Sequence, residues 1–230
     1  MKKLKFYALA VCLMFGLNTF AQEKHEWNFR LRAISIIPQE SATIGVIGGN
    51  INISNAYVPE LDITYFFAKN FSAELILGTS KHKVKTVGSN LTAIGGAASA
   101  DVDLGKVWLL PPTLTLQYHL PTQCAVKPYL GAGINYTIFY GVNKGSVVQG
   151  VDYKNSASFA AQAGIDINVS KNVFLNIDVK KLLLSTTATV DAANLTPAGS
   201  PALAPVLRNI NADVKINPWV IGLGIGYRLK

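Results

Sequence analysis

The sequence predicts an all-β protein, an eight-stranded antiparallel up-and-down transmembrane β-barrel. Two observations support this fold class. Eight stretches of the chain have apolar residues at every second position, and the connections between these stretches are alternately short and long. A membrane barrel has tight turns on the periplasmic side and wide loops on the outer side, and eight is the smallest strand number common among such barrels.

The connections fall into two groups by length. The short ones, expected in the periplasm, are residues 68–70, 121–125 and 170–172. The long ones, expected as outer surface loops, are residues 38–55, 81–106, 141–155 and 186–211. The last of these contains residues 195–205, which we expect to be flexible or extended coil. An even number of strands places both chain ends on the periplasmic side.

The first four stretches separate an apolar face from a polar face at period two, as side chains do along a strand. The expected lipid-facing residues are Trp27, Phe29, Leu31 and Ala33, then Tyr57, Leu61, Ile63, Tyr65 and Phe67, then Phe71, Ala73, Leu75 and Leu77, then Trp108, Leu110, Leu114, Leu116 and Tyr118. Aromatic residues near strand ends are typical of the girdles at the two membrane interfaces.

The last four stretches follow the same rule. Their lipid-facing residues are Val126, Leu130, Ile134, Tyr136, Ile138 and Tyr140, then Phe159, Ala161, Ala163, Ile165, Ile167 and Val169, then Val173, Leu175, Ile177 and Val179, then Trp219, Ile221, Leu223, Ile225, Tyr227 and Leu229. Inward glycines at 222, 224 and 226 leave room for long side chains in a narrow lumen. Lys181 faces lipid against the pattern, which a bulge or snorkelling toward headgroups explains.

Residues 1–21 have the pattern of a secretory signal peptide, with a basic start, an apolar run from Phe6 to Leu17 and a small-residue cleavage site. We expect residues 22–230 to form one barrel domain in the bacterial outer membrane. Half of all residues are apolar, yet no stretch after residue 21 reaches the roughly 18 apolar residues of a membrane-spanning helix. A soluble β-sandwich is the alternative, but its strands usually have about five or six residues, fewer than several stretches here.

Strand direction gives each inward residue a height in the lumen, and the heights sort by polarity. The predicted upper, ligand-binding lining is Ile34, Ile36, Val58, Ile76, Val107, Leu109, Phe139, Leu182, Leu184 and Val220. The predicted lower ion-pair layer is Arg30, Arg32, Glu60, Asp62, Glu74, Lys127, Asp166, Asp178, Lys180 and Arg228. Opposite charges in a confined lumen are expected to pair, because an unpaired buried charge is costly.

Two consecutive prolines lie within the fourth stretch. Pro111 and Pro112 lack the backbone N–H that a strand donates to its neighbours. We therefore expect missing backbone hydrogen bonds there and a lateral opening in the barrel wall.

The three histidines argue against catalysis and against a metal site. His25 and His119 lie at periplasmic strand ends and His82 lies in a long loop, so we expect no serine to have a histidine partner at membrane level. Zinc needs three or four clustered ligands. We therefore expect no enzymatic activity, no metal and no cofactor.

The charge balance favours lipid over nucleic acid as a partner. Without residues 1–21 the chain has 18 basic and 13 acidic residues, a formal net charge of +5. This is mild for a polyanion-binding protein, and no compact basic run with interleaved aromatics is present. Cys124 is the one cysteine that remains, so no disulfide is expected.

Five blocks carry a resemblance to a known family. They are ELDITYFFAKNFSAELILGTSKHKV, LPPTLTLQYHL, KPYLGAGINYTIFYG, AQAGIDINVSKNVFLNIDVKKL and VKINPWVIGLGIGYR. Together they resemble the outer membrane protein W (OmpW) family over most of the mature chain. The resemblance implies an eight-stranded monomeric outer-membrane barrel with a narrow, apolar lumen that passes small hydrophobic molecules.

The sequence thus leaves two hypotheses for function. In the first, the barrel is a passive conduit that takes small hydrophobic molecules from outside and releases them sideways into the bilayer. Sideways release is expected because an apolar solute gains no free energy of burial in a dry ion-pair layer. In the second, the protein is a surface receptor or structural protein that acts through its outer loops.

Overall fold

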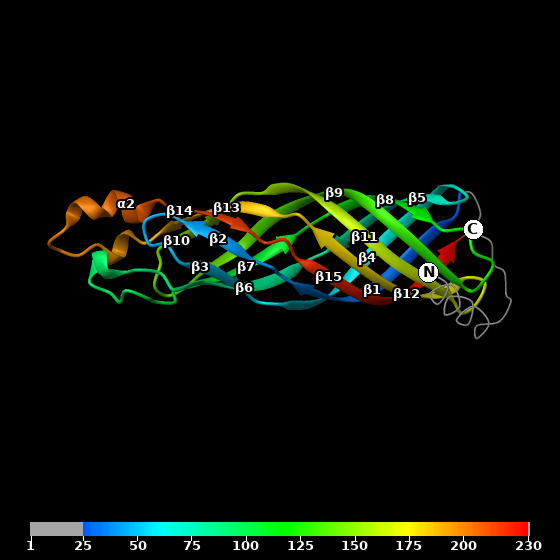
Figure 1. Cartoon of the computed structure of the whole chain (residues 1–230), viewed down its shortest axis with the longest axis horizontal. Helices are drawn as coiled ribbons and strands as arrows, with labels where there is room; N and C mark the ends of the chain where they lie inside the picture. The colour runs from blue at the N-terminus through cyan, green and yellow to red at the C-terminus, as the bar shows by residue number, and fades with distance from the viewer. Residues whose placement is uncertain (1–24, 230) are drawn as a thin grey trace, which may run out of the picture.

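A computed structural model describes residues 25–229 and shows a long barrel walled by antiparallel strands (Figure 1). Eight strands close its membrane-spanning part, each pairing antiparallel with the next and the last with the first. In order around the wall they are β1 (Trp27–Ile37), β4 (Ala56–Ala68), β5 (Phe71–Gly78), β8 (Thr113–His119), β9 (Val126–Lys144), β11 (Ser156–Asn168), β12 (Val173–Leu182) and β15 (Trp219–Leu229). The predicted fold class is confirmed, and the expected signal peptide lies outside the described residues.

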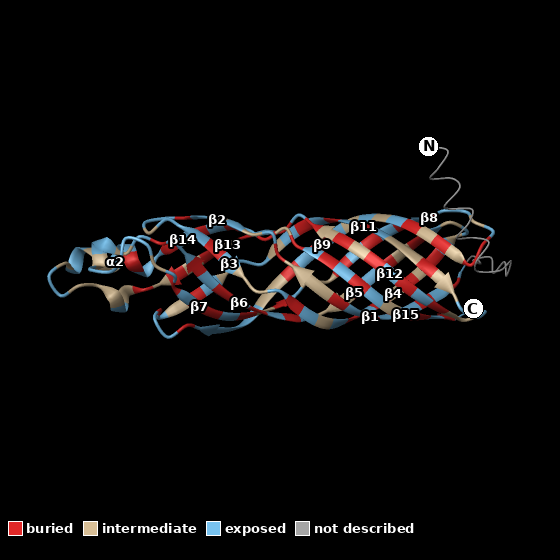
Figure 2. Cartoon of the chain, turned by 60° about the horizontal axis from the view of Figure 1, so that its bottom comes forward, coloured by how far each residue is buried: buried red, intermediate tan, exposed pale blue. Residues whose placement is uncertain are grey.

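The described chain begins and ends at the same rim. Trp27 at the start of β1 pairs with Leu229 at the end of β15 and with Tyr65 on its other side. We assign this rim to the periplasm, because the connections there are short. Buried and exposed residues alternate along the strands (Figure 2): Leu31 is 56% exposed, while Arg30 and Arg32 are buried. Within residues 25–229 no helix is long and apolar enough to cross a membrane.

The four long connections are only partly the surface loops that we predicted, because part of each folds into strands that prolong the wall. These strands are β2 (Ser41–Ile44), β3 (Asn50–Ile53), β6 (Ser80–Val87), β7 (Asp103–Leu110), β10 (Gly150–Tyr153), β13 (Ser185–Asp191) and β14 (Ile210–Lys215), while β9 itself continues to Lys144. In β6, for example, His82 and Val84 face inward and Lys83 and Lys85 face outward. The outer face is polar since water, not lipid, surrounds it.

The extension consists of two sheets with a cap. One sheet has the order β10-β13-β14-β2, and the other continues the barrel wall in the order β9-β7-β6-β3. Short helical segments close the outer end (left in Figure 1): η1 (Thr92–Ile94), η2 (Ala193–Leu195), η3 (Pro201–Leu203) and α2 (Ala204–Arg208). The prediction of coil for residues 195–205 is therefore wrong for Leu195 and for residues 201–205, which are helical, whereas residues 196–200 form no helix or strand. Buried aliphatic residues such as Ile44, Leu104 and Leu207 fill the extension as one core.

Candidate functional site

An apolar cavity of about 70 Å³ lies inside the barrel at the level where the extension begins. All ten residues of the predicted upper lining border it: Ile34, Ile36, Val58, Ile76, Val107, Leu109, Phe139, Leu182, Leu184 and Val220. They come from opposite sides of the wall, so the cavity occupies the lumen itself. A lining of this kind favours apolar ligands, since burial of apolar surface contributes about 25 cal/mol per Å².

The extension adds lining residues that the sequence-based prediction missed. Ile51 and Ile53 come from β3, Tyr153 from β10, Val214 from β14, and Ile216 follows β14. The alternation in Asn-Ile-Asn-Ile at residues 50–53 was the available signal. Burial raises the pKa of the Tyr153 hydroxyl, so this group stays protonated and neutral beside the cavity.

A few polar side chains also border the cavity, and the histidine among them is fully bonded. His82 Nδ1 lies 2.7 Å from the carbonyl oxygen of Ser54, and its Nε2 lies 3.0 Å from Ser80 Oγ. The prediction that no serine has a histidine partner concerned only the membrane level, and this contact lies on β6 in the extension. The two side chains meet because residues 80 and 82 belong to one strand and face the same side.

Charged residues form the floor of the cavity. Glu60 and Lys180 border it from below and form an ion pair with each other. Lys180 Nζ also lies 3.2 Å from Asp178 Oδ1. All three side chains are buried, so the apolar cavity ends directly on an ion-pair layer.

Two arginines organise this layer. The two terminal nitrogens of Arg30 lie 2.7 Å from Glu74 and 2.9 Å from Asp166. Those of Arg32 lie 2.6 Å from Asp62, 3.2 Å from Glu74 and 3.3 Å from Glu60. Arg32 Nη2 is 3.9 Å from Asp178. Because Glu74 bridges both guanidinium groups, the layer is one connected network across the lumen.

Neutral side chains that the sequence-based prediction missed complete the network. Tyr129 Oη donates to Asp178 at 2.6 Å, and the amide nitrogens of Gln117 and Gln162 each donate to Glu74 at 2.7 Å. Tyr129 and Gln117 alternate with the lipid-facing residues of β9 and β8, so their inward direction was readable from period two. Every hydrogen bond of this kind closes the layer further to water.

The inward glycines make space for side chains of neighbouring strands. A Cβ on Gly224 would lie 2.7 Å from Arg32 Cγ, and one on Gly226 would overlap the ring of Phe174. The Phe174 ring in turn lies under the guanidinium of Arg30, whose Cζ is 5.4 Å from the ring centroid. The predicted room for long side chains is therefore used by residues of the adjacent strands β1 and β12.

Two expectations for the lower lumen need correction. Lys127 is not in the ion-pair layer. Its Nζ donates to the carbonyl oxygen of Thr122 at 2.7 Å, because this oxygen of the periplasmic turn is its nearest acceptor. Arg228 pairs with Glu26 at 2.6 Å, in an ion pair of its own near the rim.

His119 lies at the periplasmic end of β8, as predicted, and its Nε2 lies 3.0 Å from Ser72 Oγ, a contact that the sequence-based prediction did not include. Ser72 pairs in register with Gln117, so His119, two residues on, is its diagonal neighbour. The pair is packed under Phe66, with the two ring centroids 4.6 Å apart.

The barrel wall is interrupted at Pro111 and Pro112. Toward β5 and β6, pairing stops at Ile76 with Thr113 and resumes at Ser80 with Leu109. Toward β9 the break is narrower, because the N–H of Tyr136 donates to the carbonyl oxygen of Pro112 at 3.0 Å. No further ladder bond joins the two prolines to their neighbours among the described residues.

Asn135 closes the inner side of this break. Its Nδ2 donates to the carbonyl oxygens of Pro111 and Pro112 at 3.1 and 3.3 Å and to Thr113 Oγ1 at 2.8 Å. Its Oδ1 accepts from Thr137 at 2.7 Å. One side-chain amide thus supplies hydrogen-bond donors to the proline carbonyl oxygens on the inner side of the break.

Two further hollows adjoin the cavity. On the lipid side, a groove lined by Leu75, Leu114, Ile134 and Phe159 shares Thr113 with the cavity. Under the cap, a wholly apolar hollow of about 40 Å³ shares Ile51 with it. Thr113 therefore borders both the cavity and the lipid-side groove, and Ile51 borders both the cavity and the hollow under the cap.

Comparison with known proteins agrees with this architecture. The profile of the OmpW family matches residues 23–229. An uncharacterised outer-membrane protein, y4mB of Sinorhizobium fredii, is 42% identical over 88% of this chain and 79% of its own. Outer membrane protein W of Escherichia coli is 31% identical over 99% of this chain and 100% of its own.

A solved structure shows the same fold. The crystal structure of OprG, an outer membrane protein of Pseudomonas aeruginosa, superposes with a TM-score of 0.77 at 24% identity, over 92% of this chain and 99% of that one. Family profile, relatives and barrel together place this protein in the bacterial outer membrane. The chain belongs to the OmpW family of outer-membrane β-barrel proteins.

Proposed function

We propose that the barrel passes small hydrophobic molecules from outside into the upper cavity and releases them sideways into the bilayer at Pro111 and Pro112. The observation that carries the proposal is the order of the three hollows. The space under the cap adjoins the cavity at Ile51, and the cavity adjoins the lipid-facing groove at Thr113. An apolar solute stays in contact with apolar surface along this route.

The ion-pair layer supports sideways release over straight passage. A solute that continued downward would have to separate Lys180 from Glu60 and then cross the Arg32 network. Breaking a buried pair costs about 3–5 kcal/mol, and apolar surface offers no compensating hydrogen bonds. The break in the wall needs only the displacement of Asn135.

A relative's name points to the same class of compound. A protein of a dibenzothiophene metabolism operon in Pseudomonas aeruginosa, PahQ, is 26% identical over 94% of this chain. Dibenzothiophene is an apolar polycyclic molecule. We infer that this chain takes molecules of comparable size and polarity.

Two variants of the wall should change release in opposite directions. Replacing Pro111 and Pro112 together by threonine and valine restores two backbone donors, and release should slow several-fold. Asn135→Ala removes the amide that holds the break shut, and release should become faster. The assay uses liposomes that contain the barrel, and a fluorescent apolar probe is added from outside. The rate at which the probe enters the bilayer is measured.

Pro121→Thr in a periplasmic turn is the matched control and should leave the rate unchanged. Equal rates for all variants would contradict lateral release. If liposomes with and without the barrel took up the probe equally, and deletion of the cap abolished binding of a partner, the receptor hypothesis would replace the conduit.

A further inference from the structure

The outer face of β6, β7 and β9 carries an aromatic row at the upper edge of the membrane-spanning part. Lys81, Trp108 and Tyr140 are in register across the three strands. Trp108 stacks with Tyr140 at 6.2 Å between centroids, and Lys81 Nζ stands 5.1 Å from the Trp108 ring. Tryptophan and tyrosine in such positions lie at headgroup level, so this row marks the membrane interface.

The next outward-facing row is cationic. Lys83 on β6 is directly opposite Lys106 on β7, and Lys106 is opposite Asn143 on β9. Lys83 is two residues beyond Lys81, which puts the row about 7 Å farther along the strand, on the side away from the membrane centre. Both lysines are exposed, and among residues 25–229 neither has a carboxylate within salt-bridge distance.

The neighbouring lysine is different. Lys85 Nζ forms a salt bridge with Asp101 at 3.0 Å, and the hydrogen bond from Lys85 lowers the pKa of that carboxyl group. Asp103, which is opposite Lys85 on β7, accepts a hydrogen bond from the Gly105 N–H at 2.8 Å, so both acidic residues near this face have partners other than Lys83 and Lys106. Lys83 and Lys106 remain as two like charges directly opposite each other, an arrangement that destabilises a sheet.

The backbone at this point is held firmly. Lys83 N donates to Ser54 Oγ at 3.0 Å, and Ser54 N donates to the carbonyl oxygen of Lys83 at 3.0 Å. The two ammonium groups and the Asn143 amide thus project from paired strands, and all of them are hydrogen-bond donors. An anion with several acceptor oxygens complements this row and relieves the repulsion.

We propose that this face binds the phosphorylated headgroup of an outer-leaflet lipid. A phosphate group lies between Lys83 and Lys106, and the sugar that carries it rests on the Trp108–Tyr140 row. The acyl chains run down the lipid-facing side past Leu110. The depth of the row, one step beyond the aromatic interface, is what favours a lipid headgroup over any soluble anion.

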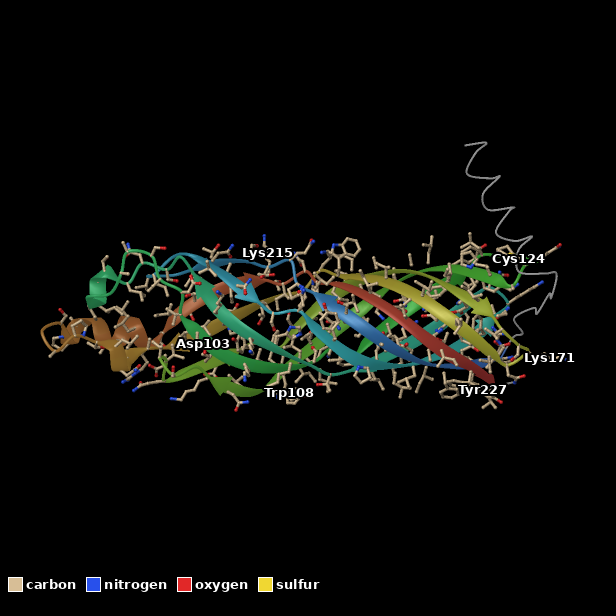
Figure 3. All side chains as sticks on the ribbon, turned by 90° about the horizontal axis from the view of Figure 1, so that it is seen from below. Asp103, Trp108, Cys124, Lys171, Lys215 and Tyr227 are labelled. Carbon is tan, nitrogen blue, oxygen red and sulfur yellow. The ribbon has the colours of Figure 1, made fainter. Side chains whose placement is uncertain are left out.

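The opposite side of the barrel lacks this arrangement. Lys215 on β14 pairs in register with Ser41 and Ser185, and Asp213 is the next outward residue on the same strand. Figure 3 shows Lys215 and Trp108 on opposite edges of the barrel. Lys154 and Lys215 border one polar groove on that side. These two lysines provide a control of equal charge at a similar height.

The test uses the protein purified from outer membranes in a zwitterionic detergent and titrated with bisphosphorylated lipid A. Native mass spectrometry measures the bound fraction. The double variant Lys83→Gln/Lys106→Gln should bind about twentyfold more weakly, since each lysine near an anionic lipid surface contributes roughly a fivefold factor. Lys83→Arg/Lys106→Arg should retain binding, which separates the charge from any effect on folding.

Two comparisons make the result decisive. The control Lys154→Gln/Lys215→Gln should bind as the unchanged protein does, and dephosphorylated lipid A should bind weakly to all variants. Equal losses of lipid A binding in the two double glutamine variants would overturn the proposal, because the lipid would then be attracted by the overall positive charge and not by one site. Equal binding of phosphorylated and dephosphorylated lipid would overturn it as well.

Discussion

Replacing Arg32 by methionine is expected to destabilise the folded barrel by about 3–5 kcal/mol, the typical cost of removing one partner from a buried ionic cluster. Arg32 contacts Asp62, Glu60 and Glu74 within 3.3 Å. Without it Glu60 keeps Lys180 and Glu74 keeps Arg30, but Asp62 loses the one salt bridge that it forms among the described residues. Urea unfolding in lipid vesicles, followed by tryptophan fluorescence, measures the loss.

The same variant should also admit water and ions, because the network that seals the lumen loses its centre. Planar-bilayer recordings should show small or no steady currents for the unchanged barrel and larger currents for Arg32→Met. Lys85→Met, which removes an exposed pair with Asp101, is the control and should change neither stability nor current. A fully stable, sealed Arg32→Met barrel would show that the layer is not a connected plug.

Leu182→Asp is expected to reduce uptake of an apolar probe by about ten- to a hundredfold. Leu182 borders the cavity and is 7% exposed. The substitution removes an apolar contact worth about 1.5–3 kcal/mol and adds a carboxylate that a hydrophobic ligand cannot solvate. Probe transfer into vesicles that contain the barrel provides the measurement.

Leu182→Met keeps the volume and the apolar character and should transport nearly as the unchanged protein does. Arg32→Met is the second comparison, since it should alter stability and current much more than the affinity for the probe. Equal losses of uptake in Leu182→Asp and Arg32→Met would contradict the division of the lumen into an apolar zone and an ionic zone.

Period-two alternation was sufficient to predict the closed barrel and the direction of its inward residues. The alternation predicted that Ile34, Phe139 and Leu184 face inward, because a strand fixes which face each residue occupies. All three border one cavity. It also placed Arg30 and Arg32 at one depth, since both lie on β1 and face inward. Whether those cavity residues bind a ligand is the proposal tested above.

Alternation fixes a face but not a partner, which is why other expectations were wrong. Lys127 points inward as expected, yet the Thr122 carbonyl is closer to it than any carboxylate of the layer. The contact between Ser72 and His119 was not predicted, because it depends on β5 and β8 being neighbours in register. Partners of this kind depend on strand pairing and side-chain reach.

The extension was missed for a different reason. Strands β2, β3 and β10 have four residues each, too few for a periodic pattern to stand out from a loop. Their outer faces are polar, so they also lack the apolar alternation that lipid imposes on longer strands. Pairing with β14, β6 and β13 stabilises them, and the sequence of one short strand does not reveal its partner.

Photolabelling of inward-facing residues tests the proposed route most directly. An apolar diazirine probe is added from outside to intact cells, activated by light, and located by peptide mass spectrometry. Lipid-facing residues are disregarded, since probe dissolved in the bilayer labels them in any case. The account predicts labels on the cavity residues Val107, Leu182 and Val220 and on Thr113. It predicts none in the ion-pair layer below, on Gln117 or on Asn176, whose Oδ1 accepts a hydrogen bond from Arg32 Nε at 2.7 Å. Labels on Gln117 and Asn176 comparable to those on Leu182 would show straight passage through the lumen and contradict lateral release.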